Sequence, residues 1–210
     1  MADRAEKNSW GQRMSDELDD LIAAVEPVKA AFEKLGVRFF VGGSVASSWH
    51  GATRSTMDID LVAELSLENV AQFIGLVDQD FYASEAAIRE AIERTSCFNL
   101  IHNATSFKID IFVSRNRPFD QDSFARAEQG EIGGRFKLNV PVASAEDIIV
   151  SKLEWYRLGE ETSERQWEDV SRVLRLLGDA VDGKYLSSAA DQVGVLDLWE
   201  KLKREMESNF

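Results

Sequence analysis

The sequence predicts an α+β fold, in which a mixed β-sheet flanked by helices is followed by a C-terminal helical subdomain. Strand-like and helical segments alternate up to about residue 140, and only helical periodicity follows Pro141. The 210 residues are 44% hydrophobic and 29% charged, which is typical of a globular chain with a real core. We therefore expect an N-terminal helical segment over residues 1–36, a sheet core over 37–140 and a helical subdomain over 141–210.

The first segments predict helices and strands in a definite order. Residues 15–35 have the pattern of a helix that begins at Ser15 and ends at Gly36, and Pro27 predicts a break with a second helix starting near Glu26. Ser66 and Ser84 are expected to cap later helices. The expected strands are 37–41, 57–63, 97–102, 106–113 and 135–139, and the expected helices are 43–49, 66–77, 84–94 and 119–127.

The segment after Pro141 predicts four helices, over 144–158, 163–177, 185–193 and 195–206. Ser144 is the expected cap of the first helix. Ser163 and Gln166 have the spacing of a capping box, and Gly178 is the expected stop of the second helix.

The charge balance limits the partners. With 24 basic and 37 acidic residues, the formal charge is −13. This excess argues against broad, non-specific nucleic-acid binding, which depends on neutralising phosphates with Lys and Arg. It permits a local basic groove, and one basic-leaning stretch could rim such a groove: Arg115, Arg117, Arg126, Arg135 and Lys137.

Other features of the sequence indicate the compartment. No run of 18 uncharged apolar residues occurs, so we expect no membrane span and no membrane partner. The polar N-terminus lacks the apolar region of a signal peptide, and we expect a cytoplasmic protein. Cys97 is the only cysteine, which excludes a disulfide framework and a thiolate zinc site, and we expect its thiol to be buried in the core.

The most informative stretch is residues 39–61. An apolar strand leads into Gly42, Gly43 and Ser44, where a helix begins. Paired glycines let the backbone approach a phosphate closely, and the N–H groups that follow lie at a positive helix terminus. The sequence therefore predicts a phosphate-binding turn, with the Ser44 hydroxyl as a further donor.

Two aspartates follow on the next expected strand. Asp58 and Asp60 project to one face, about 6.5–7 Å apart along the strand. Such a pair can share divalent ions, as in two-metal sites with ions about 3.5–4 Å apart. A third carboxylate, Asp110, lies in an F-K-I-D-I-F strand, on the same face as Lys108. Because neighbouring carboxylates repel one another, we expect two Mg²⁺ ions here, with Mn²⁺ as the alternative.

These residues resemble the signature of the polymerase-beta-like nucleotidyltransferases, in which Gly-Ser precedes an Asp-x-Asp strand and a third acid follows on a later strand. The AbiEii/AbiGii toxin-type branch is the most similar. The features that carry this resemblance are G-G-S before R-S-T-M-D-I-D-L, the F-K-I-D-I-F strand, and the helical D-I-I-V-S-K-L-E-W and R-Q-W-E-D-V. The resemblance covers about residues 37–175.

The resemblance implies a nucleotidyltransferase-type fold and a role for each matching residue. Asp58, Asp60 and Asp110 would be the catalytic residues and the metal ligands, with Asp110 also activating the acceptor hydroxyl. The residues implied to bind nucleotide are Gly42, Gly43, Ser44, Arg54, Thr56 and Lys152. Asp169 matches a charged position of the helical motif, while Gln166 departs from the Arg-Asp pair that is usual in this branch.

The implied activity is transfer of a nucleoside monophosphate from an NTP to an acceptor hydroxyl. The toxin-type branch implies RNA, such as a tRNA end, as the acceptor and a cognate antitoxin protein as a partner. Two alternatives stay open. An acidic protein attracts cations, which favours a small aminoglycoside-like acceptor. The chain could also be a catalytically silent module that binds a nucleotide.

Overall fold

The computed structural model describes residues 2–51, 58–133 and 136–208. The chain divides into two compact units that interleave along the sequence. The first unit comprises residues 1–41, 55–115 and 129–141, and the second comprises 42–54, 116–128 and 142–210. The consecutive domains expected from the sequence stay a prediction.

The described strands form one seven-stranded sheet in the order β3-β4-β5-β2-β1-β7-β6. Their bounds are β1 Phe39–Val41, β2 Asp58–Ala63, β3 Phe81–Tyr82, β4 Cys97–His102, β5 Lys108–Val113, β6 Glu128–Gly133 and β7 Lys137–Val142. The strands β2 and β5 are parallel, whereas β1 pairs with β2, and β4 with both β3 and β5, in antiparallel fashion. The sheet is therefore mixed, as expected.

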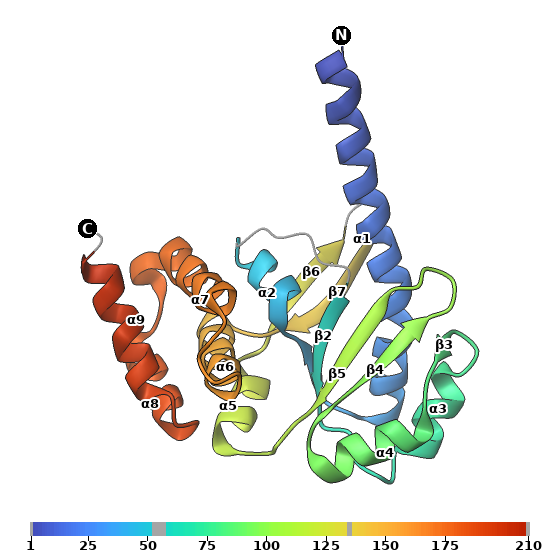
Figure 1. The fold of residues 1–210 in the computed structure, drawn as a ribbon. Coiled ribbons are helices and arrows are strands. Elements are labelled where there is room, and N and C mark those ends of the chain that lie inside the picture. Colours follow the sequence, from blue (N-terminus) through green and yellow to red (C-terminus); the bar gives the residue numbers. More distant parts are fainter. Residues whose placement is uncertain (1, 52–57, 134–135, 209–210) are drawn as a thin grey trace. The chain divides into compact units, whose positions relative to one another are not determined.

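One face of this sheet forms the core of the first unit. The buried side chains of β2 and β5 alternate with half-buried ones, so Ile59 and Ile109 lie on the apolar face. Helices α1 (Ala2–Leu35), α3 (Val70–Val77) and α4 (Glu85–Arg94) complete the unit (Figure 1). The Phe32 ring of α1 stacks on Phe73 of α3 at 5.2 Å between centroids, and Phe73 also contacts Phe98 of β4 edge-on. These helices therefore seal the apolar face.

The second unit is helical in its described part. Its helices are α2 Gly43–Trp49, α5 Pro118–Arg126, α6 Ala145–Leu158, α7 Glu164–Leu177, α8 Gly183–Gln192 and α9 Leu196–Ser208, with a 3₁₀ turn at Gly178–Ala180. The fully buried Leu153, Leu186 and Leu202 bring α6, α8 and α9 into one core. The expected N-caps are confirmed, because Ser144 and Ser163 each accept a hydrogen bond from the backbone N–H three residues on.

The expected break at Pro27 is wrong, because α1 continues through it. The neighbouring Val25 and Val28 are fully buried. Their burial holds the helix together although proline removes one backbone hydrogen bond. The expected cap at Ser66 is also wrong. Helix α3 begins at Val70, and the Ser66 hydroxyl donates to Asn69 Oδ1 at 2.8 Å in the preceding turn.

Two strands were not predicted. Strand β3 has two residues, and β6 has the polar sequence E-Q-G-E-I-G, without the apolar alternation that indicates a strand. Both lie at the edges of the sheet, where pairing with one neighbour suffices. No helix in the described ranges is long and apolar enough to cross a bilayer.

A buried polar cluster joins three helices of the second unit. Asp147 of α6 is 1% exposed and accepts hydrogen bonds from Ser144 Oγ at 2.7 Å and from the Tyr185 hydroxyl of α8 at 2.5 Å. Arg126 of α5 lies 3.6 Å from the same carboxylate and stacks on the Tyr185 ring. Desolvation raises the pKa of Asp147 above its ordinary 3.8, and the hydrogen bonds oppose this rise.

Truncation of the helical core should destabilise the protein strongly. Leu153→Ala removes a fully buried side chain of α6, and the cavity should lower the free energy of unfolding by about 2–5 kcal/mol. Leu176→Ala on α7 is the matched control, because that side chain is 55% exposed and its loss should cost less than about 0.5 kcal/mol. Urea denaturation measures both. Equal losses would contradict the assigned core.

The buried Asp147 should make stability depend on pH. Between pH 3.8 and the raised native pKa, the native carboxyl keeps a proton that the unfolded chain has released. The free energy of unfolding therefore falls as pH rises through this window. In Asp147→Asn this contribution is absent, so the stability of wild type relative to the variant should decline with rising pH. Tyr185→Phe removes a hydrogen-bond donor to the Asp147 carboxylate, which should raise the pKa of Asp147 further and extend the decline in stability to higher pH. Urea denaturation at several pH values tests this, and a relative stability that rises with pH would contradict it.

Candidate functional site

The predicted carboxylates meet on one face of the sheet. The parallel pairing of β2 with β5 places Asp60 opposite Asp110 and Asp58 opposite Lys108. All four side chains lie on the half-buried face, while the intervening isoleucine and leucine side chains are buried on the other. This arrangement, hereafter the carboxylate face, comprises Asp58, Asp60, Lys108 and Asp110.

A lysine ammonium lies among these carboxylates. Lys108 Nζ donates to Asp110 Oδ2 at 2.7 Å and lies 3.8 Å from Asp58 Oδ2. The hydrogen bond to Asp110 and the negative charges of the three aspartates raise the pKa of Lys108, against a smaller opposing effect of desolvation. The alternation of the strand predicted that Lys108 shares a face with Asp110. Its contact with Asp58 was not predicted, and it arises because β2 and β5 are neighbouring parallel strands.

The neighbouring strand β4 adds two polar groups to this face. Asn99 lies opposite Asp110 in the antiparallel register, and Cys97 lies opposite Phe112. The expectation of a buried core thiol is wrong, since Cys97 is exposed. Desolvation by its surroundings, with the charges of Asp110 and Asp60, raises the pKa of Cys97 to about 12. The thiol is therefore protonated near neutral pH and is not an activated nucleophile.

The donors of the carboxylate face fit a hard divalent cation. In the described part of the chain, no three acidic, histidine or cysteine side chains gather closely enough to hold a metal ion. The face nevertheless offers carboxylate oxygens, which Mg²⁺ prefers. One cation, the Lys108 ammonium, already lies between Asp58 and Asp110. The donor chemistry thus suits such an ion.

The glycine turn belongs to the second unit. Gly42 precedes α2 in an extended conformation, and Gly43 has a φ of +56°, which favours glycine. The Gly43 carbonyl accepts from Ser47 Oγ at 2.8 Å, while Ser44 is half-buried in the first turn of α2. Arg54 and Thr56 lie outside the described residues, so their predicted role stays a prediction.

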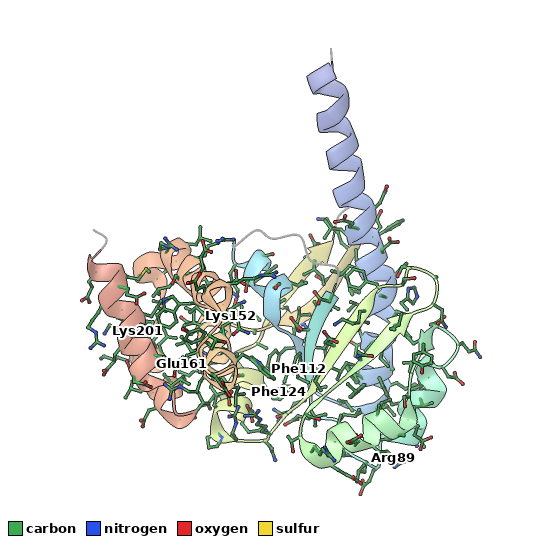
Figure 2. The ribbon with its side chains drawn as sticks, in the orientation of Figure 1. Arg89, Phe112, Phe124, Lys152, Glu161 and Lys201 are labelled. Carbon is green, nitrogen blue, oxygen red and sulfur yellow. The ribbon has the colours of Figure 1, made fainter. Side chains whose placement is uncertain are left out.

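The two helical charges that matched the family pattern meet in the second unit. Lys152 of α6, labelled in Figure 2, has its Nζ 3.9 Å from Asp169 Oδ2 of α7, and each side chain is 19% exposed. This contact between α6 and α7 was not predicted from the sequence. Gln166, the departure from that pattern, has a buried Oε1 that accepts no hydrogen bond from the described residues.

The basic stretch is not a free cationic surface at the positions where its contacts are described. Arg117 binds Asp120 and Glu154, with its Nη1 2.6 Å from Glu154 Oε1. Arg126 binds Glu146 at 2.8 Å, and Lys137 binds Glu131 at 2.5 Å. The positive charges of these three side chains are therefore compensated within the protein.

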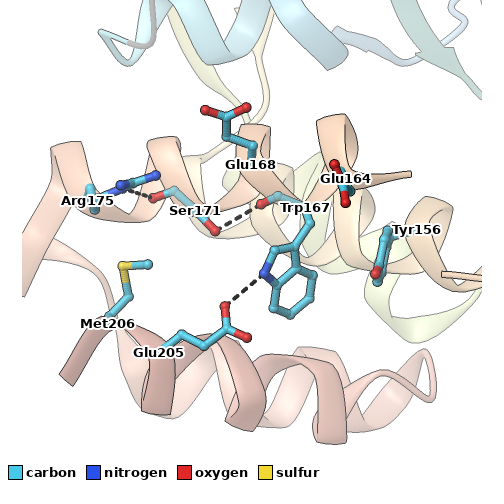
Figure 3. Close-up of a pocket in the computed structure, with 8 residues that line it drawn as sticks. All are labelled: Tyr156, Glu164, Trp167, Glu168, Ser171, Arg175, Glu205 and Met206. Carbon is cyan, nitrogen blue, oxygen red and sulfur yellow. Dashed lines mark hydrogen bonds between the residues drawn. The ribbon is translucent and has the colours of Figure 1, made fainter. Parts of the chain in front are cut away.

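A pocket of about 310 Å³ lies among α6, α7 and α9 (Figure 3). The Trp167 Nε1 donates to Glu205 Oε2 at 2.8 Å, and Arg175 donates to the Ser171 carbonyl within its wall. The pocket is lined by Tyr156, Glu164, Trp167, Glu168, Ser171, Arg175, Glu205 and Met206. None of the predicted site residues lines it.

Comparisons with known proteins find similar folds among solved structures. No family model matches the chain, and no curated protein matches its sequence. Among solved structures, an antigenic nucleotidyltransferase-like protein from Paracoccidioides brasiliensis is similar, with a TM-score of 0.56, 19% identity and coverage of 93% of this chain and 92% of that one.

The antibiotic-resistance factor ANT(2'')-Ia is also similar. Its complex with adenylyl-2"-tobramycin has a TM-score of 0.55, with 16% identity over 82% of this chain and 96% of that one. Its solution structure has a TM-score of 0.52, with 16% identity over 91% and 97%. With its mixed sheet and its helical second unit, the chain has the nucleotidyltransferase fold.

Proposed function

We propose that this protein is a metal-dependent nucleotidyltransferase, which moves a nucleoside monophosphate from an NTP to an acceptor hydroxyl. The observation that carries the proposal is the register of β2 and β5, which brings Asp58, Asp60 and Asp110 to one face. Three carboxylates on adjacent strands repel one another, and binding divalent cations is the function that best explains their shared placement.

The reaction forms a bond between the acceptor oxygen and the α-phosphorus and breaks the bond to the β-phosphate, so that pyrophosphate leaves. Asp110 accepts the proton of the acceptor hydroxyl. Asp58, Asp60 and Asp110 would hold a divalent ion, Mg²⁺ or Mn²⁺, which would supply positive charge to offset the triphosphate. Little covalent chemistry is asked of the protein, because positioning and charge stabilisation carry this kind of transfer.

The remaining predicted residues are assigned to the nucleotide. The backbone N–H groups after Gly42 and Gly43, and the Ser44 hydroxyl, bind triphosphate oxygens. Lys152 contributes a cation to the same phosphates, and Asp169 orients its ammonium, which the 3.9 Å contact supports. Arg54 and Thr56 complete the nucleotide-binding set by their match to the family pattern.

For the acceptor, we favour a small cationic molecule with free hydroxyl groups, such as an aminoglycoside. The net charge of −13 attracts cations, and Arg117 and Arg126 are held in ion pairs rather than presented to a phosphate backbone. The similarity to ANT(2'')-Ia, which was solved with an adenylylated tobramycin, extends over 82% of this chain and supports this class.

RNA is the second candidate acceptor, in a toxin controlled by an antitoxin protein. The motifs shared with the AbiEii/AbiGii toxin-type branch support it, and so does the meeting of Lys152 with Asp169, since both match charged positions of that branch. An RNA acceptor needs cationic surface that Arg117 and Arg126 do not supply.

Removing a single carboxylate should abolish transfer without unfolding the protein. Asp58→Asn, Asp60→Asn and Asp110→Asn should each lower the turnover number by at least about a hundredfold, because each removes charge from the metal site. Pyrophosphate release with NTP and Mg²⁺ measures the loss, and far-UV circular dichroism reports the fold. Asp78→Asn, an exposed aspartate after α3, should retain wild-type activity. Wild-type rates in the three variants would refute the assigned site.

An acceptor competition should separate the two candidate classes. The protein is incubated with α-labelled NTPs, Mg²⁺, total RNA and a panel of aminoglycosides. We expect the label in the aminoglycoside fraction, since the protein attracts cationic acceptors. Label in RNA alone would favour the toxin, and co-expression of a neutralising antitoxin would then be the next measurement. Nucleotide binding without turnover on any acceptor would indicate the silent module.

A further inference from the structure

Lys108 lies where a bound cation would be expected. It is opposite Asp58 in the parallel register and two residues before Asp110 on its own strand. Its ammonium is 2.7 Å from one carboxylate oxygen of Asp110 and 3.8 Å from one of Asp58. A single side chain of the first unit thus offsets charge from both strands of the carboxylate face.

An ion and this ammonium compete for the same oxygens. The hydrogen bond from Lys108 at 2.7 Å occupies one lone pair of Asp110 Oδ2 and places a positive charge beside that oxygen. Mg²⁺ requires oxygen ligands at about 2.0–2.1 Å in near-octahedral geometry. Two cations crowded among the same carboxylates also repel each other. This repulsion favours displacement of the ammonium when a divalent ion binds at Asp58 and Asp110.

The Lys108 side chain is exposed and flexible enough to move away from the carboxylates. It is 41% exposed and ends in a compact charge on a flexible four-carbon stem. Asp110, by contrast, is 16% exposed, so its carboxylate is held in place while the ammonium can move into solvent. The same exposure means that salt screens the lysine contact appreciably.

We propose that Lys108 is a built-in counter-cation, which neutralises the carboxylate face in the ion-free protein and is displaced by the divalent ion. Lys108 thereby sets the ion concentration at which the site fills. This inference rests on the proposed function insofar as Asp58 and Asp110 bind that ion. Lys108 is accordingly a positioning residue, which acts through the carboxylates.

The test measures ion binding without nucleotide or acceptor. Full-length wild type, Lys108→Met and Lys108→Arg are titrated with Mn²⁺ at low ionic strength, and the loss of the free Mn²⁺ electron paramagnetic resonance signal gives the dissociation constant. We expect Lys108→Met to bind Mn²⁺ about tenfold more tightly, because the competing charge is gone. Lys108→Arg keeps the charge and should resemble wild type.

Two further measurements separate competition from a general structural effect. In EDTA, Lys108→Met should melt at a lower temperature than wild type, and saturating Mn²⁺ should restore its melting temperature. Lys137→Met is the matched control, since Lys137 also pairs with a glutamate in the same unit but lies on β7, two strands from β2. It should leave the Mn²⁺ affinity unchanged.

The outcomes distinguish this inference from the proposed function. Unchanged or weaker Mn²⁺ binding by Lys108→Met would overturn the inference. If wild type still bound Mn²⁺ and Asp58→Asn and Asp110→Asn lost it, the proposed metal site would stand without the role of Lys108. Failure of wild type and Lys108→Met alike to bind Mn²⁺ would overturn both. Binding by Lys108→Met alone would support the inference in its strongest form.

Discussion

The parallel pairing of β2 with β5 is the constraint on which the candidate site depends. Side chains alternate along a strand, so burying Ile59 and Ile109 against the helices of the first unit turns Asp60 and Asp110 to the opposite face. A register slip of one residue on either strand would place a carboxylate in the apolar core. The hydrophobic effect that stabilises the sheet therefore also fixes the positions of the charged groups.

Part of the acidic excess of the chain is paired with the arginines of the basic stretch. Glutamates and aspartates of the second unit hold Arg117 and Arg126, and they do so at 2.6–2.9 Å. Such contacts neutralise basic side chains that, from the sequence alone, would be expected to bind phosphates. The basic stretch is therefore even less available to a polyanion than the net charge of −13 alone indicates.

Local signals in the sequence predicted local structure well. The alternation in D-I-D-L and F-K-I-D-I-F predicted which side chains share a face, and Ser84, Ser144 and Ser163 all cap helices. Features that depend on distant residues were not predictable. The continuation of α1 through Pro27 depends on burial of its neighbours in the tertiary structure. The polar strand β6 forms because it pairs with β7. The exposure of Cys97 depends on which face of β4 is covered. The contact of Lys108 with Asp58 belongs to this second group, because it exists only if β2 and β5 are neighbours.

A cation supplied by the chain itself changes how the site relates to folding. Three uncompensated carboxylates on adjacent strands would oppose formation of the sheet, and a protein that relied on an ion to offset them would fold only when loaded. Lys108 lies in the strand that carries Asp110, so the compensating charge arrives with that strand as the sheet forms. The charge of the face is then partly offset before an ion binds, and a divalent ion that binds there has to compete with an exposed ammonium. Under the proposed function, the stability of the sheet and the binding of the metal ion therefore depend on different cations. Lys108 supports the first, and the divalent ion serves the second.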